Sequence, residues 1–192
     1  SAVKIEDGGL HLGMSSAQVN DRVNTAKNIV NYAIGMNNHM GSAATADPQL
    51  MTYLMTALQE KHLFFLDSRT IGKSVAGKIA KEQGVRSLDR HIFLDDSNEL
   101  ANVQHQFQAA IQYARKHGTA IAIGHPRPNT IAVLQAGLNN LPADIQLVGM
   151  GNLWRNEKVI PPKPFVLLFT EMPAPTSIEP FEPVGLLRGI PK

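Results

Sequence analysis

The sequence predicts an α/β domain built on a mostly parallel sheet. Apolar runs of four or five residues, the length of buried strands, alternate along the chain with segments whose apolar residues recur at helical spacing. The 192 residues are 43% hydrophobic, which is enough for a sizeable core in one domain. Because alternating strands and helices form parallel sheets covered by helices, we expect either an open doubly wound sheet or part of a barrel.

The first half of the chain supplies two helices and two strands. Ser15 or Ser16 can cap the first helix, and Asp47 followed by Pro48 has the pattern that opens the second. The strands are short apolar runs between these helices. The expected elements are a helix to about Asn31, a strand at 32–36, a helix from Pro48 to about Lys61 and a strand at 63–66.

The second half continues the alternation. Asp96 or Ser97 is the simplest cap for its long helix, and Gly118 after two basic residues is a good signal for the end of that helix. The expected elements are a helix from about Ser74 to Gln83, a strand at 91–94, a helix from about Asn98 to His117, a strand at 120–123, a helix from Asn129 to about Asn140 and a strand at 145–148.

The last 38 residues differ in composition from the rest. Eight of the twelve prolines lie in Arg155–Lys192, so we place a boundary there, with a domain at 1–154 and a proline-rich tail at 155–192. The tail also contains the apolar run Phe165–Phe169. We expect this run to dock as an added strand or apolar strap, on the domain or on a neighbouring copy, since an exposed run of this kind promotes aggregation.

Composition excludes several classes of protein. A net charge of +2 with scattered basic residues argues against a nucleic-acid partner. No apolar run approaches the length of about 20 residues that a membrane span needs, and we see no signal peptide in this chain. The absence of cysteine excludes disulfides, thiolate metal sites and a cysteine nucleophile.

Ionisable and polar residues follow four of the five expected strands. The carboxyl ends of parallel strands share one edge of a sheet, where ligand sites of α/β folds lie, so we expect His39, Asp67 and His125 to approach one another there. The candidates are, in strand order, Asn37, Asn38 and His39; Asp67, Ser68 and Arg69; Asp95; and His125.

Each candidate also has a structural interpretation. The side chains of Asp67 and Ser68 could stabilise a turn by hydrogen bonds to the nearby backbone. Asp95 could be structural or belong to a site. His39 lies in a polar, tightly turned loop that a core histidine would not need. His125 stands between a glycine and a proline, which hold a rigid loop, and it is well suited to general acid or base catalysis.

Four blocks of sequence carry a resemblance to a known family. They are IGMNNHMGS at 34–42, FFLDSRT at 64–70, FLDD at 93–96 and AIGHPRP at 122–128. In this order and spacing they resemble the divergent polysaccharide deacetylases of the bacterial envelope, from about Gly9 to about Leu153.

The resemblance implies a deformed parallel β/α barrel and a metal-dependent N-deacetylase that acts on acetylated glycans in the periplasm or outside the cell. It implies a divalent metal, with zinc as the expected ion. His125 matches the late histidine that acts as acid, Asp67 the carboxylate that orients it, and His39 a metal ligand. The supporting or substrate-binding residues would be Asn37, Asn38, Ser68, Arg69 and Asp95.

The chain departs from the family pattern at its amino end. The family domain begins with a strand that ends in Asp-Asp and later has a strand that ends in His-Leu-Pro-Met, and neither is present. The expected barrel is therefore incomplete there, without the catalytic base and at least one metal ligand, and with a gap or an exposed apolar face before Tyr32. The alternative function is a non-catalytic envelope protein that binds glycan or docks a partner through its tail.

Overall fold

The computed structural model describes residues 8–39 and 42–156. By its contacts the chain divides into Ser1–Val159 and Ile160–Lys192, and every described residue lies in the first unit. The predicted apolar strap at Phe165–Phe169 lies outside the described residues, so its docking stays a prediction. The helices are α1 (Ser16–Ile29), α2 (Ser42–Thr45), α3 (Pro48–Glu60), α4 (Ala76–Glu82), α5 (Leu100–His117), α6 (Pro128–Leu138) and α7 (Met150–Arg155). The strands are β1 (Gly35–Asn37), β2 (Phe64–Asp67), β3 (Ser87–Asp89), β4 (Ile92–Phe93) and β5 (Ala122–Ile123).

The strands form two short parallel sheets rather than one. One sheet has the order β1-β2-β3 and the other pairs β4 with β5. In the second sheet Phe93 lies opposite Ile123. The predicted α/β class and the parallel pairing are confirmed. The part of the chain that the structure describes contains no closed barrel.

Most helix ends follow the predicted local chemistry. Ser15 caps α1 and forms a reciprocal capping box with Gln18. The Asp47 carboxylate accepts a hydrogen bond from the backbone of Leu50 at the start of α3, at 2.7 Å. Gly118 ends α5 with a left-handed φ of 80°, which glycine adopts without steric cost.

The predicted cap of α5 is wrong. The helix begins at Leu100, later than expected, and its N-cap is Glu99, which makes no side-chain capping bond. The hydroxyl of Ser97 instead accepts a hydrogen bond from the backbone of Glu99 at 3.4 Å, in the turn that precedes the helix. The carboxylates at the end of β4 are therefore not used to cap α5.

Two predicted strands need correction, and one strand was not predicted. The first strand begins at Gly35 rather than Tyr32, because the preceding residues form the turn after α1. The expected strand at 145–148 is irregular backbone that leads into α7, and Ile145 packs on the α5–α6 cluster instead of pairing. The strand β3 was not predicted, since Ser-Leu-Asp has a single apolar residue and is defined by its pairing with β2.

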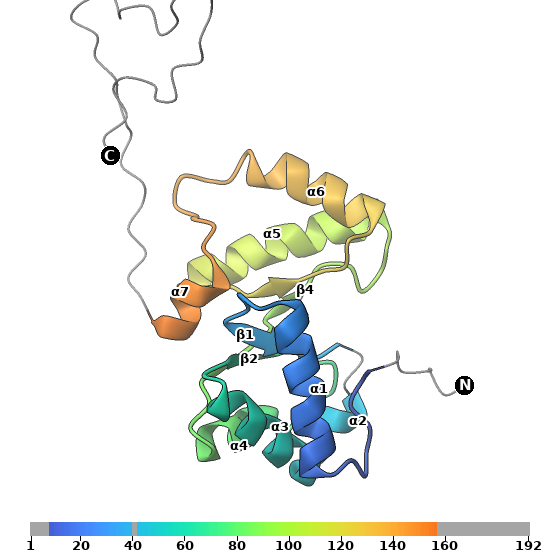
Figure 1. Cartoon of the computed structure of the whole chain (residues 1–192). Helices are drawn as coiled ribbons and strands as arrows, with labels where there is room; N and C mark the ends of the chain where they lie inside the picture. The colour runs from blue at the N-terminus through green and yellow to red at the C-terminus, as the bar shows by residue number, and fades with distance from the viewer. Residues whose placement is uncertain (1–7, 40–41, 157–192) are drawn as a thin grey trace, which may run out of the picture. The chain divides into compact units, whose positions relative to one another are not determined.

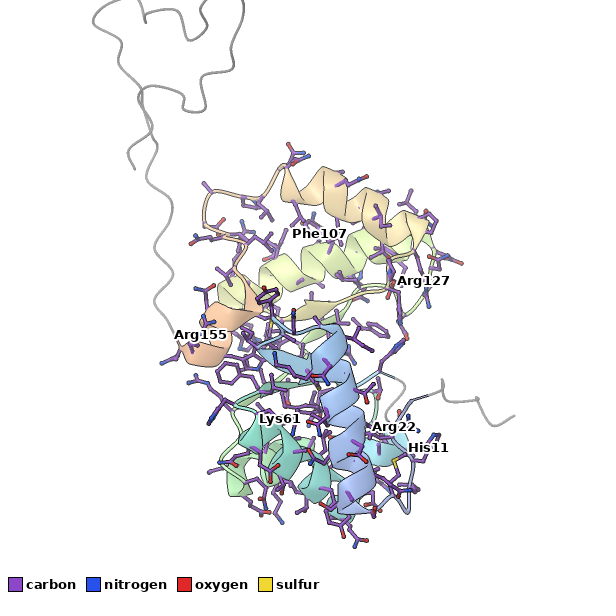
Figure 2. The ribbon with its side chains drawn as sticks, viewed as in Figure 1. His11, Arg22, Lys61, Phe107, Arg127 and Arg155 are labelled. Carbon is purple, nitrogen blue, oxygen red and sulfur yellow. The ribbon has the colours of Figure 1, made fainter. Side chains whose placement is uncertain are left out.

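Each sheet has its own helical cover (Figure 1). The helices α1, α3 and α4 share one core cluster with Phe65 of β2. The helices α5 and α6 share a second cluster with Leu94, and Phe107 lies between them (Figure 2). A third cluster joins Leu66 of β2, Ile121 just before β5 and Trp154 of α7. These clusters hold the carboxyl ends of the strands in place.

The end of α1 and the turn after it expose apolar side chains. Tyr32 is 91% exposed and Ile29 is 77% exposed, with Val30 also exposed. The gap or exposed apolar face of the sheet that the sequence predicts before Tyr32 stays a prediction. Among the described residues, no helix combines the length and the apolar character that crossing a membrane requires.

Candidate active site

The carboxyl ends of β4 and β5 place an aspartate beside a histidine. Asp95 is 1% exposed, and one of its carboxylate oxygens lies 3.0 Å from Nδ1 of His125. The other oxygen accepts hydrogen bonds from the backbone N–H of His125 at 2.7 Å and from the hydroxyl of Thr130 at 2.9 Å. Three donors therefore converge on one buried carboxylate.

These contacts determine the charge of Asp95. Burial by itself would raise the pKa of Asp95, but hydrogen bonds from the backbone and the imidazole of His125 and from Thr130 together hold that pKa below its ordinary value. An ionised carboxylate can only accept hydrogen bonds, so Nδ1 of His125 must carry a proton. The remaining ring nitrogen, Nε2, is then the atom available for proton transfer, and the side chain of His125 is 33% exposed.

The loop after β1 brings a second histidine to the same place. The ring centroids of His39 and His125 lie 5.7 Å apart, with the rings tilted by 50°. Phe93 of β4 lies on His125 as well, with centroids 5.5 Å apart. The predicted approach of His39 and His125 is confirmed, whereas their chemical roles remain predictions.

Asp67 is not the carboxylate that orients His125. It is fully buried, and its two oxygens accept hydrogen bonds from the backbone of Arg69 at 2.8 Å and the hydroxyl of Ser74 at 2.6 Å. Because β2 pairs with β3, Asp67 lies opposite Asp89. The predicted assignment of Asp67 as orienting group is thus corrected to Asp95, which follows β4, the strand paired with the one that precedes His125.

The other residues after β1 and β2 bind the two loops together. Ser68 donates its backbone N–H to Oδ1 of Asn38 at 2.8 Å and its hydroxyl to the carbonyl of Asn38 at 2.6 Å. Asn37 donates weakly to the hydroxyl of Ser68 at 3.4 Å. The buried Nδ2 of Asn38 has no hydrogen-bond acceptor among the residues described. Ser68 and Asn38 therefore support the backbone next to His39, and substrate contact by Asn37 stays a prediction.

Arg69 has an unusual backbone conformation at the site edge. Its φ of 49° lies in the left-handed region, which costs energy for a residue with a side chain. Its guanidinium lies 3.7 Å from the carboxylate of Asp89, and both side chains are 44% exposed. An ion pair this exposed contributes little to stability. The substrate-binding role of Arg69 stays a prediction.

The described residues supply too few ligands for a complete zinc site. Zinc in proteins takes three or four nitrogen, sulfur or carboxylate ligands. Within 8–39 and 42–156, no three histidine or carboxylate side chains are grouped so that they could hold one metal ion. His39 offers one imidazole, since Nδ1 of His125 is engaged by Asp95 and Nε2 of His125 is the atom available for proton transfer. A metal held here needs ligands from elsewhere.

Sequence comparison decides the family. Residues 1–154 match the family described as divergent polysaccharide deacetylase. The chain belongs to this family. The chain is 93% identical over all its 192 residues to an uncharacterized protein of Haemophilus influenzae, of which it covers 69%. It is 44% identical over 162 residues to the uncharacterized protein YibQ of Escherichia coli. The aligned residues cover 83% of this chain and 51% of YibQ.

A solved structure supports the fold of this chain. The uncharacterized protein ATU2773 of Agrobacterium tumefaciens matches with a TM-score of 0.65 and 23% sequence identity, over 68% of this chain and 53% of that protein. At this identity the match shows the fold alone. The chain spans about half the length of YibQ and of ATU2773, so the activity of a whole protein is a matter for proposal.

Proposed function

We propose that this protein functions as a metal-dependent N-deacetylase that acts on acetylated glycans of the cell envelope, in the periplasm or outside the cell. The observation that carries the proposal is the buried Asp95 carboxylate bonded to His125 at a strand rim that also presents His39. Family membership supports the substrate class. We also propose that the two short sheets are parts of a deformed β/α barrel.

The proposed reaction cleaves the amide bond of an N-acetylated sugar with water, giving acetate and a free amine. As the C–N bond breaks, the leaving nitrogen needs a proton. The imidazolium of His125 would donate it from Nε2, while Asp95 holds Nδ1–H and stabilises the positive ring. A divalent metal in such enzymes activates water and polarises the carbonyl. His39 is the candidate ligand of this chain, and the described residues do not complete the set.

The test measures acetate released from N-acetylglucosamine oligosaccharides by the purified protein with added zinc. We expect His125→Ala and Asp95→Asn to lower the rate by about a hundredfold or more. His105→Ala is the matched control, because His105 is exposed on α5 and is expected to leave the rate unchanged. Equal rates in all three variants would contradict the proposal.

One observation favours a second function, glycan binding without catalysis. Zinc needs at least three protein ligands, and the described residues contain no group of three histidine or carboxylate side chains that could hold it. Elemental analysis separates the two functions. Stoichiometric zinc with acetate release supports the deacetylase. Oligosaccharide binding that persists without metal, with no acetate released, supports the binding protein.

A further inference from the structure

The connection between the two sheets contains one arginine that contacts both halves of the site. Arg90 lies between β3 and β4, so it follows the last strand of one sheet and precedes the first strand of the other. It is partly buried, and sequence analysis did not select it. Burial lowers the pKa of Arg90 below its ordinary value, while the charges of Asp96 and Asp67 oppose that shift. Arginine stays charged under ordinary conditions.

On one side, Arg90 binds three successive backbone carbonyls, one at the end of β2 and two in the loop after it. Its backbone N–H donates to the carbonyl of Asp67 at 2.9 Å. Its guanidinium donates from Nε to the carbonyl of Ser68 at 2.5 Å and from Nη2 to that of Arg69 at 3.0 Å. The loop includes the left-handed Arg69, whose conformation is unfavourable without such support.

This loop holds the segment that carries His39. Ser68 makes two hydrogen bonds to Asn38, at 2.8 Å and 2.6 Å, and Asn38 directly precedes His39. The position of Asn38 thus depends on a loop whose carbonyls are bound by Arg90. A displacement of Ser68 would move the backbone next to His39.

On the other side, Arg90 contacts the ring that packs on His125. The guanidinium carbon lies 4.7 Å from the centroid of Phe93, within the range of a cation–π interaction. The Phe93 ring in turn lies 5.5 Å from that of His125, tilted by 55°. Asp95 holds Nδ1 of His125, so Phe93 and Asp95 constrain the imidazole from two sides.

We propose that Arg90 is a positioning residue that sets the placement of His39 relative to His125. It acts through Ser68 and Asn38 toward the first histidine and through Phe93 toward the second. Lysine cannot replace it, because an ammonium is a single point of charge. The planar guanidinium binds two carbonyls and at the same time lies against the ring of Phe93. This inference rests on the site proposed above, yet it concerns the geometry of that site and not the reaction.

The test follows the histidine ring signals by NMR in the full chain, using Arg90→Lys and the control Arg86→Lys. Arg86 is exposed just before β3. We expect Arg90→Lys to shift the ring signals of both His39 and His125 and to weaken the cross-relaxation between the two rings. We expect Arg86→Lys to change neither.

A second variant keeps the inference testable if Arg90→Lys does not fold. Phe93→Leu removes the contact between Arg90 and the ring beside His125, so it should shift the His125 ring signals more than those of His39. A folded Arg90→Lys with unchanged ring signals would overturn the proposal, and so would Phe93→Leu that moves neither histidine. Because the readout is the geometry of the rings, an absence of deacetylase activity leaves this test valid.

Discussion

Asp95 lies beside His125 because β4 and β5 pair in parallel and both residues follow their strands at the same offset. Phe93 is opposite Ile123, and Asp95 and His125 each come two residues later. The separation of 3.0 Å between the carboxylate and Nδ1 is therefore a consequence of strand register. Asp67, in a strand of the other sheet, has no such relation to His125.

The two buried aspartates should respond differently to the same substitution. Asp95→Asn replaces the acceptor at Nδ1 of His125, so we expect the His125 ring signals to shift in an NMR spectrum. Asp67→Asn is the matched control, since Asp67 bonds Arg69 and Ser74 and should leave these signals in place. If Asp67→Asn moved the His125 ring and Asp95→Asn did not, the corrected assignment would be wrong.

Asp95 should also contribute to stability in a pH-dependent way. Its pKa is lowered in the folded state, so its contribution is present above the unfolded value of about 3.9 and is lost as pH falls through the folded pKa. At neutral pH we expect Asp95→Asn to lower the free energy of unfolding by about 1–3 kcal/mol. Urea unfolding should show this difference shrinking in acid, and a difference that grows below pH 4 would contradict it.

His91 should make the β4–β5 pairing sensitive to mild acid. Burial lowers the pKa of His91, with Asp89 raising it and His117 lowering it, and Nδ1 accepts the backbone N–H of Ile121 at 2.9 Å. Tyr113 stacks on the ring, with centroids 4.7 Å apart. Protonation of Nδ1 must break the hydrogen bond from Ile121. The contribution of His91 to the free energy of unfolding is therefore fully present above the unfolded pKa of about 6.5, and it is lost as pH falls toward the lower folded pKa.

Thermal unfolding of His91→Asn at several pH values checks this expectation. The asparagine carbonyl can still accept the hydrogen bond from Ile121, but it does not titrate. We expect the loss of melting temperature between pH 7.5 and pH 5.5 to be smaller in this variant than in the parent. His105→Asn, at an exposed position on α5, should lose as much melting temperature over this pH interval as the parent does. An unchanged pH dependence in His91→Asn would refute the role of His91.

Gly35 is expected to tolerate no side chain. A Cβ at this position would lie 2.8 Å from a ring carbon of Trp154 and 3.0 Å from the carbonyl of Phe64. We expect Gly35→Ala to destabilise the domain by about 1–3 kcal/mol through overpacking. Gly72→Ala is the control, because nothing lies within 4 Å of its Cβ. The chain has one tryptophan, so fluorescence directly shows whether Trp154 is displaced.

Gly137 provides a test of the packing between α5 and α6. A Cβ there would lie 2.4 Å from the ring of Phe107, so Gly137→Ala should destabilise, even though alanine favours helix by about 1 kcal/mol. Phe107→Leu shortens the opposing side chain. The double variant should therefore lose less stability than the sum of the two single variants. Additive losses in urea unfolding would show that the two positions do not contact.

The sequence by itself determined the local features of this protein. The cap at Asp47, the stop at Gly118 and the apolar runs of β2 and β5 depend on neighbouring residues, so they could be predicted. The same holds for the rim, because strand direction decides which residues follow each strand. His39 and His125 were found in this way.

The tertiary structure decided which of these residues touch. Asp67 and Asp95 both follow strands and look equivalent in sequence, and the division into two sheets determines that Asp95 contacts His125. Arg90 carries no motif and acquires its contacts only where the two sheets meet. The short strand β3 exists only through its pairing with β2. Pairing depends on residues far apart in the chain, and local sequence patterns do not encode that choice.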